Sequence, residues 1–336
     1  MRRSFPLALA ALAVLGTLTA CAPAQGAASP TPVASPAATP TPTPTPAVAL
    51  VEAGTLPPGV FGGDCGVAVP AGVLAAATGI EGIEVTVRDV KWTRAINNVG
   101  GLVCEWRGGN VSGEVTIVPK AALEGAALPA AEAHFYFGAC DWGCSWETDS
   151  ADLWISGYAT DLPDRGRAEA DRIGAEIAAG IAANAAAANV DWQLDRTRWW
   201  PAQGCETLAA ELTAHLGRPV AAQAAAYHDP PSAATALADI ASHRTWCAFE
   251  IDGRQIAVAV FESGAAWDVP WADLGEVVDL GVPGVEAFRS TQGGYLGGQV
   301  YEATDGVNAM TVEVAPDSGW GAEDLATVFA AAFVAP

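Results

Sequence analysis

The residue types best suited to chemistry gather around "ACDWGCSW", where Cys140 and Cys144 are separated by three residues and His134 lies upstream. Thiolates and an imidazole would suit Zn²⁺ or copper, but a structural zinc site needs four ligands and a fourth is not evident. A local disulfide is the interpretation we favour, since disulfides form readily in an oxidising compartment. We therefore predict no metal and no cofactor.

The histidines and carboxylates form no recognisable catalytic motif. His134, His215, His228 and His243 are not part of a Gly-x-Ser-x-Gly or His-Glu-x-x-His pattern. The glycine-rich "GGYLGG" at 293–298 precedes a strand-like run, which is typical of a turn and not of a phosphate-binding loop. We predict no catalytic residues. A hydrolase that uses dispersed carboxylates or a histidine-centred site is the alternative.

Several of the twelve tryptophans lie in loop-like or proline-flanked stretches. Indoles at a surface can stack on sugar rings or anchor a protein partner. Burial beneath long loops is the competing interpretation. The candidate binding surface consists of Trp142, Trp146, Trp267 and Trp271.

The N-terminus has the pattern of a secretory signal peptide, with two arginines followed by an apolar run that is too short to span a bilayer. The order Leu18-Thr19-Ala20-Cys21 resembles the lipobox of bacterial lipoproteins. The resemblance implies that residues 1–20 are removed and that Cys21 carries a lipid. An ordinary cleavage site with an incidental cysteine is the alternative. Two acyl chains would hold the protein stably on a membrane.

Residues 21–55 are expected to form a stalk, because proline recurs at nearly every second position between Ser29 and Ala47. Such a tract buries little apolar surface and favours extended polyproline II. The expected location is the extracytoplasmic face of a bacterial cell membrane, with the lipid at Cys21 as the contact with the membrane.

The charge of the chain excludes some partners. The formal net charge is −22, and it becomes −24 when Arg2 and Arg3 leave with the signal peptide. Nucleic acid and anionic lipid surfaces attract positive charge, so we predict no nucleic-acid binding and no contact with the bilayer beyond the anchor.

A repeat organises the remainder of the chain. Cys65 is followed 39 residues later by "CEWRGGNVSGEVTIV", and Cys205 is followed 42 residues later by "CAFEIDGRQIAVAVF". In each half an apolar helical stretch follows the first cysteine, strand-like runs follow the second, and an amphipathic helix comes last. We predict an α+β fold with two tandem, related domains at 56–190 and 201–336, joined by a linker at 191–200. Each domain is expected to be a small antiparallel sheet with helices packed on one face.

The duplication also predicts how the cysteines pair. We expect Cys65–Cys104 and Cys205–Cys247, each tying the first helix of a half to a central strand, and a local Cys140–Cys144 bridge in the first half. Closing a loop of about 40 residues would stabilise each half by roughly 4 kcal/mol.

The lipobox, the stalk, the cysteine at the start of a helix and the Cys-x-Trp that enters a strand together resemble actinobacterial cell-envelope lipoproteins with small disulfide-tied α+β domains. Extracellular sensor domains of mycobacterial envelope kinases have a broadly similar layout. The resemblance implies surface placement and binding, and it transfers no catalytic residue.

The function predicted from the sequence is therefore that of a non-catalytic, lipid-anchored binding protein. Its expected partner is an envelope glycan, a small ligand or another envelope protein. A structural spacer or assembly protein is a further alternative beside the hydrolase.

Overall fold

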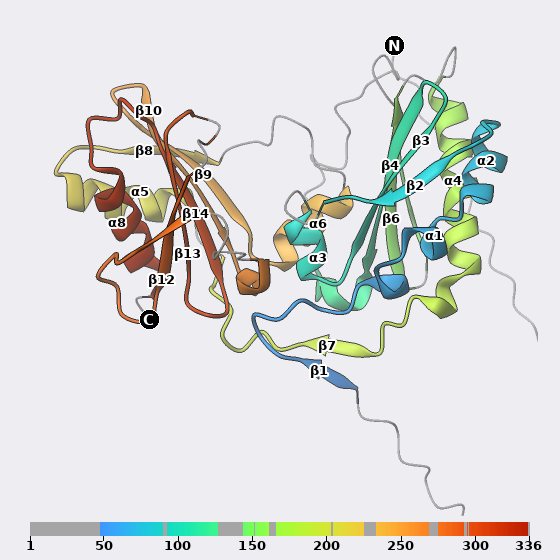
Figure 1. Cartoon of the computed structure of the whole chain (residues 1–336), viewed down its shortest axis with the longest axis horizontal. Helices are drawn as coiled ribbons and strands as arrows, with labels where there is room; N and C mark the ends of the chain where they lie inside the picture. The colour runs from blue at the N-terminus through green and yellow to red at the C-terminus, as the bar shows by residue number, and fades with distance from the viewer. Residues whose placement is uncertain are drawn as a thin grey trace, which may run out of the picture. The chain divides into compact units, whose positions relative to one another are not determined.

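The computed structural model describes residues 48–89, 93–126, 144–150, 152–160, 166–202, 204–224, 233–268, 275–291, 294 and 296–334 (Figure 1). Residues Ala47–Pro336 group into one compact unit. The signal peptide, Cys21 and most of the predicted stalk lie outside the described residues. No helix within the described ranges has the length and apolar character needed to cross a membrane.

The first sheet is antiparallel, with the strand order β2-β3-β4-β6-β5. Its strands are β2 (Glu84–Val87), β3 (Leu102–Gly108), β4 (Val111–Pro119), β5 (Cys144–Asp149) and β6 (Leu153–Thr160). A tight turn at Gly109 and Asn110 joins β3 to β4, and Gly109 adopts a φ of 59°, a conformation that glycine tolerates better than residues with a side chain. Strand β4 lies at the centre of the sheet.

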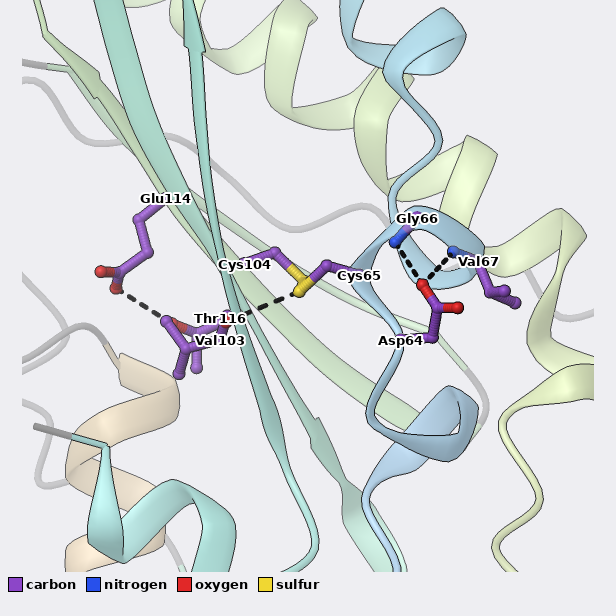
Figure 2. The surroundings of a disulfide bond; sticks show 8 residues. All are labelled: Asp64, Cys65, Gly66, Val67, Val103, Cys104, Glu114 and Thr116. Carbon is purple, nitrogen blue, oxygen red and sulfur yellow. Dashed lines mark hydrogen bonds between the residues drawn. A yellow bond between two sulfur atoms is a disulfide. The ribbon is translucent and has the colours of Figure 1, made fainter. Parts of the chain in front are cut away.

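Helices α1 (Cys65–Ala68), α2 (Ala71–Thr78) and α4 (Arg167–Ala183) cover one face of this sheet (Figure 1). Pro70 separates α1 from α2, where the sequence pattern predicts one helix. Asp64 caps α1, because its carboxylate accepts hydrogen bonds from the backbone N–H groups of Gly66 (2.7 Å) and Val67 (3.2 Å), as Figure 2 shows. The amphipathic helix predicted at the end of the first half is α4, and its isoleucine stripe packs into the core of the first sheet: Ile173, Ile177 and Ile181.

The second sheet is also antiparallel, with the order β11-β12-β13-β14-β10-β9-β8. Its strands are β8 (Ala221–Ala224), β9 (Thr245–Ile251), β10 (Arg254–Glu262), β11 (Gly275–Val278), β12 (Glu286–Ser290), β13 (Gln299–Thr304) and β14 (Ala309–Val314). Helices α5 (Cys205–Leu216) and α8 (Ala322–Val334) lie side by side on one face (Figure 1). Phe329 of α8 packs against Phe249 of β9 and Phe261 of β10.

The two halves repeat the same order of elements. In each, a helix that begins at a cysteine is followed by an outer strand, a short helix, a disulfide-bearing strand, a central strand and a 3-10 turn, and an amphipathic helix comes last. The short helices are α3 (Arg94–Asn98) and α6 (Ala233–Ala241), and the 3-10 turns are η3 (Lys120–Leu123) and η5 (Ala265–Asp268). Strands β11 and β12 have no described counterpart in the first half. The fold is α+β with two related antiparallel sheets, as the sequence predicts.

Both repeat disulfides are present. Cys65 bonds to Cys104 and Cys205 bonds to Cys247, and in each pair the Cα atoms are 5.5 Å apart. Each bridge joins the first residue of a helix to the strand that forms a hairpin with β4 in the first sheet and with β10 in the second. Cys140 and the side chain of Cys144 lie outside the described residues, so their predicted bridge stays a prediction.

The short helices and turns of the two halves contact each other reciprocally. Helix α3 of the first half lies against η5 of the second, α6 of the second half lies against η3 of the first, and α3 and α6 lie against each other. Four apolar residues of α6 are buried in one cluster with residues of the first half: Ala234, Leu237, Ala238 and Ala241. These contacts place two helices on the side of the first sheet opposite α1, α2 and α4, beyond the one-face packing that we predicted.

Two short strands form a separate parallel pair, β1 (Ala49–Val51) with β7 (Trp192–Leu194). Strand β1 lies within the segment that the composition assigns to the stalk, and β7 lies within the expected linker. Trp192 also fits against Gly100, where a Cβ atom would come within 2.3 Å of the indole ring. The segment between the halves is therefore part of the folded structure.

Candidate functional site

The structure removes Trp146 from the predicted tryptophan surface. Its side chain is only 4% exposed and packs in the core against Gly157 and Gly174, where a Cβ atom would come within 2.3–2.5 Å of the indole. Trp267 is half-buried, and its Nε1 donates a hydrogen bond to Asn98 Oδ1 (3.1 Å). Trp142 and Trp271 lie outside the described residues.

The "GGYLGG" loop encloses a carboxylate of the protein itself. The backbone N–H groups of Leu296 and Gly298 donate hydrogen bonds to Glu313 on β14. A Cβ atom on Gly294 would come within 2.2 Å of that carboxyl group. Since these backbone donors already have an internal anion, the described part of the loop is a structural turn, as its sequence indicates.

The described histidines have structural surroundings. His243 Nδ1 lies 2.7 Å from the carbonyl oxygen of Trp200, and the His243 ring meets Trp199 edge-on. His215 is exposed in the last turn of α5, and His134 and His228 lie outside the described residues. No group of three metal-ligating side chains occurs in the ranges that the structure describes.

A group of polar residues lies on the face of the first sheet opposite the disulfide. Figure 2 shows the Cys65–Cys104 bridge on one side of the strands and the side chains of Glu114 and Thr116 on the other. Since residues two apart on a strand share a face, β3 to β6 place the neighbouring polar residues on this side too. We call this group the polar face; it comprises Arg88, Glu105, Glu114, Thr116, Ser145, Glu147, Ser156 and Tyr158.

The strand register arranges the polar face in two adjacent rows. In one row Tyr158 of β6 lies opposite both Glu114 and Ser145. In the next row Ser156 lies opposite both Thr116 and Glu147. Ser145 and Ser156 are therefore diagonal neighbours on β5 and β6.

Much of the polar face is shielded from solvent. The exposed fraction is 8% for Glu114, 1% for Thr116, 3% for Ser145 and 0% for Ser156. Val115 and Ile117, which point to the helix-covered face, are also fully buried. Both faces of β4 are thus covered, although one of them carries polar groups.

Helix α6 covers one end of the polar face. Val118 and Trp154, the next cross-strand pair beyond Thr116 and Ser156, pack in one apolar cluster with Leu237 of α6. The opposite end is more open, since Glu105 is about half exposed and Arg88 about a third exposed. The polar face therefore runs from an ionic, open end to an apolar, closed end.

An arginine and two carboxylates mark the open end. Arg88 forms an ion pair with Glu114 and a second with Glu105, at 3.5 Å. Thr116 Oγ1 donates a hydrogen bond to Glu114 Oε1 (3.3 Å). Burial raises the pKa of Glu114 above its usual value, because the loss of hydration outweighs the attraction of Arg88.

Two serine hydroxyls on the polar face are buried without a hydrogen-bond partner. Ser145 Oγ and Ser156 Oγ are shielded from solvent and make no hydrogen bond in the structure. A buried hydroxyl that forms no hydrogen bond costs about 1–3 kcal/mol, so most such groups in proteins have a partner. These two hydroxyls are the donors and acceptors that a ligand could use.

The second half shows that the fold does not require this polarity. The two sheets can be matched by strand register, starting from the residues that pair with Cys104 and Cys247. In this match valines take the places of three polar residues: Val258 for Glu114, Val260 for Thr116 and Val300 for Ser145. Ser156 matches Thr311, which is half-buried where Ser156 is fully buried. Among the residues that the structure describes, buried hydroxyls without a hydrogen-bond partner therefore occur in the first half alone.

The sequence analysis missed the polar face, although a signal for it was present. In "VSGEVTIV" the polar Ser112, Glu114 and Thr116 alternate with glycine, valine and isoleucine, as expected for a strand with one polar face. Alternation normally indicates a solvated face. Only the structure reveals that this face is buried and joined by serines from β5 and β6.

The chain was compared with known proteins by family, by sequence and by structure. No family model, no curated protein and no solved structure matches it.

Proposed function

We propose that this protein is a lipid-anchored, extracytoplasmic binding protein of the bacterial cell envelope, and that it binds a small ligand at the polar face of its first sheet. The main support for this binding site is that the hydroxyls of Ser145 and Ser156 are buried and have no hydrogen-bond partner. A ligand that hydrogen-bonds to both would remove the energetic cost of leaving them unsatisfied.

The location is supported by the sequence of the N-terminus. The basic start, the apolar run and the lipobox-like Leu18-Thr19-Ala20-Cys21 favour export and lipid attachment at Cys21. The proline-rich tract that follows would hold the folded part away from the membrane, since an extended chain spans about 3.1 Å per residue. An anchored binding domain of this kind would meet ligands in the envelope.

Binding is favoured over catalysis by the groups on the polar face. Nucleophilic catalysis needs a nucleophile with an adjacent base. Ser145 and Ser156 form no hydrogen bond to a histidine or carboxylate, and the described His243 lies against a backbone carbonyl. Neutral hydroxyls beside an ion pair are better suited to holding a ligand than to transforming it.

Native mass spectrometry of the full chain, purified with its anchor in a mild detergent, tests this proposal. We expect the native mass of the wild-type protein to exceed its denatured mass by the mass of a retained small molecule. The double variant Ser145→Ala/Ser156→Ala should lose this molecule. The matched control is Thr311→Ala, which removes a hydroxyl at the corresponding position of the second sheet and should retain it.

Other outcomes decide between the alternatives. Equal retention in all three proteins would place the ligand elsewhere and overturn the proposed site. Conversion of the retained compound during incubation would favour the envelope hydrolase. A wild-type protein that retains nothing and binds none of the probes described below would favour a spacer or assembly role.

A further inference from the structure

The charges around the two serines restrict the chemistry of a ligand, and this step rests on the proposed binding function. The buried, unpartnered groups of the two rows are hydroxyls, whereas the charged groups have interactions of their own. Arg88 is paired with both Glu105 and Glu114, and Glu147, opposite Ser156, also has an interaction of its own. Arg107 is exposed and lies opposite Ser112, one row beyond the Glu114–Tyr158 pair.

An anionic group is a poor fit for this position. A buried anion needs a cation or several donors to replace its hydration. Arg88 is shared by two carboxylates, and Glu147 lies opposite Ser156 on the neighbouring strand. A phosphate or carboxylate beside the serines would therefore meet mainly like charge.

A cationic group fits little better. An ammonium group bound next to Ser145 and Ser156 would need a carboxylate that is not already occupied. Glu105 and Glu114 share Arg88, and Glu147 has an interaction of its own. Removing the ammonium group from water would thus have little compensation in this part of the sheet.

Neutral hydroxyl groups match what the serines offer. A hydroxyl both donates and accepts a hydrogen bond, and so does each serine. Diagonal positions on neighbouring strands have Cβ atoms somewhat less than about 7–8 Å apart, close enough for two groups of one small ligand to reach both serines. Tyr158, between Glu114 and Ser145 in the same row, adds a partly buried ring that can pack against an apolar sugar face.

We propose that the ligand of the polar face is an uncharged polyhydroxyl compound, of the class of neutral sugars and cyclic polyols, hydrogen-bonded by Ser145 and Ser156. The inner end of such a ligand lies toward the cluster formed by Val118 and Trp154. The outer end lies toward the partly exposed Arg88 ion pair.

The test is calorimetric titration of the full chain with three matched sets of probes. The first set contains neutral monosaccharides and myo-inositol, the second contains their phosphates and uronic acids, and the third contains amino sugars. We expect a member of the neutral set to bind at least tenfold more tightly than its charged counterparts. Ser156→Ala and Ser145→Ala should each weaken that binding tenfold or more, whereas Thr311→Ala should leave it unchanged.

The thermal stability of the same variants separates a binding role from a structural one. Because neither hydroxyl has a partner in the protein, Ser156→Ala and Ser145→Ala should unfold at the same temperature as the wild type or higher. A lower unfolding temperature together with unchanged binding would show that the serines are structural, and would overturn the proposal.

The probe sets also separate this inference from the proposed function. Tighter binding of a phosphate or an amino sugar, lost in Ser156→Ala, would overturn the neutral-ligand class and leave the binding function standing. Absence of binding by all three sets, with no molecule retained in the native mass, would overturn both.

Discussion

Glu114 and Glu313 show two ways in which this protein accommodates a buried carboxylate. Both are 8% exposed, on β4 and β14. Glu313 is stabilised by backbone N–H groups of the "GGYLGG" loop, which cannot be removed by changing a side chain. Glu114 depends on Arg88, whose side chain is also paired with Glu105. The carboxylate on the polar face therefore depends on side chains that a substitution can remove.

The replacement Glu114→Gln should change how stability depends on pH. The pKa of Glu114 is raised in the folded protein, chiefly by burial. The folded protein therefore binds the proton of Glu114 more tightly than the unfolded chain does. The stability that this proton contributes is complete below the unfolded pKa of about 4.3 and is lost as the pH rises through the folded pKa. We expect Glu114→Gln to gain stability relative to the wild type as the pH rises from about 4 toward 8, measured by urea unfolding.

Glu105→Gln is the matched control, since Glu105 pairs with the same arginine but is about half exposed. The Glu105 charge is the weakest of the influences on the pKa of Glu114, so the stability of Glu105→Gln should follow the wild-type pH profile more closely than that of Glu114→Gln. A Glu114→Gln variant that loses stability relative to the wild type as the pH rises would mean that the ion pair with Arg88 outweighs the cost of burial.

Cys21 decides whether the protein is anchored. If the lipobox resemblance holds, Cys21→Ser should abolish incorporation of radiolabelled palmitate and move the protein from the membrane fraction to the soluble fraction. The double variant Cys65→Ser/Cys104→Ser, which removes a disulfide but leaves the lipobox, should still be labelled. Persistent labelling of Cys21→Ser would exclude this cysteine as the lipid site.

At the scale of elements, the repeat disulfides occupy equivalent positions. Each begins at the first residue of a helix and ends in the strand that pairs with β4 in the first sheet or with β10 in the second. The closed loops are similar in length, with sequence separations of 39 and 42 residues. Equivalent placement implies similar energetic effects in the two halves.

Removing either bridge should therefore destabilise the protein by a similar amount. The chain-entropy model gives about 4 kcal/mol for each loop. We expect Cys65→Ala/Cys104→Ala and Cys205→Ala/Cys247→Ala each to lose close to this amount in guanidinium unfolding. If one double variant lost much less than the other, the two halves would differ in residual unfolded structure or in native strain.

The elements that the sequence predicts well are those with a strong local pattern. The isoleucine stripe of α4 and the alternating runs of β4 and β10 are each visible in a short window. One detail differs between the two hairpins: Cys104 pairs with Val115, whereas Cys247 pairs with Ala259, one residue further along, because a bulge lies between Gln255 and Ala257.

Short elements were not predictable in the same way. Helix α3 has five residues, and strands β1 and β7 have three residues each, so none contains a full repeat of its pattern. Their structure depends on contacts distant in the sequence, such as Trp192 against Gly100. The polar face was missed for the same reason, since it combines residues of separate strands.

At the scale of the whole described molecule, the connecting segment holds the two halves together through Arg196. Its guanidinium donates a hydrogen bond to the carbonyl oxygen of Ala241 (2.6 Å) at the end of α6 and another to Ala122 in η3. It also forms an ion pair with Glu124 (3.1 Å) and lies 4.5 Å from the ring centroid of Trp199. One side chain therefore contacts the first half, the second half and the connection between them.

On the reciprocal side of this contact, where α3 meets η5, an asparagine makes the hydrogen bonds. Asn98, at the end of α3, donates a hydrogen bond to the carbonyl oxygen of Ser263 and accepts one from Trp267 of η5. Since α3 corresponds to α6 and η5 corresponds to η3, the two contacts are reciprocal, as in a symmetric dimer interface. The contact between the halves is thus built like an association of two similar subunits, with Arg196 supplying the bonds on one side.

Replacing Arg196 should weaken this contact and reduce the cooperativity of unfolding. Arg196→Met keeps an apolar stem but leaves the carbonyl groups of Ala241 and Ala122 without their donor. Hydrogen bonds from a charged donor contribute about 1.5–3 kcal/mol each, so we expect a loss of about 3 kcal/mol and two resolved unfolding transitions in place of one. Arg198→Met removes the same charge from an exposed side chain nearby and should leave unfolding unchanged. A single transition in Arg196→Met, at wild-type stability, would mean that the apolar contacts of α6 are sufficient to couple the two halves.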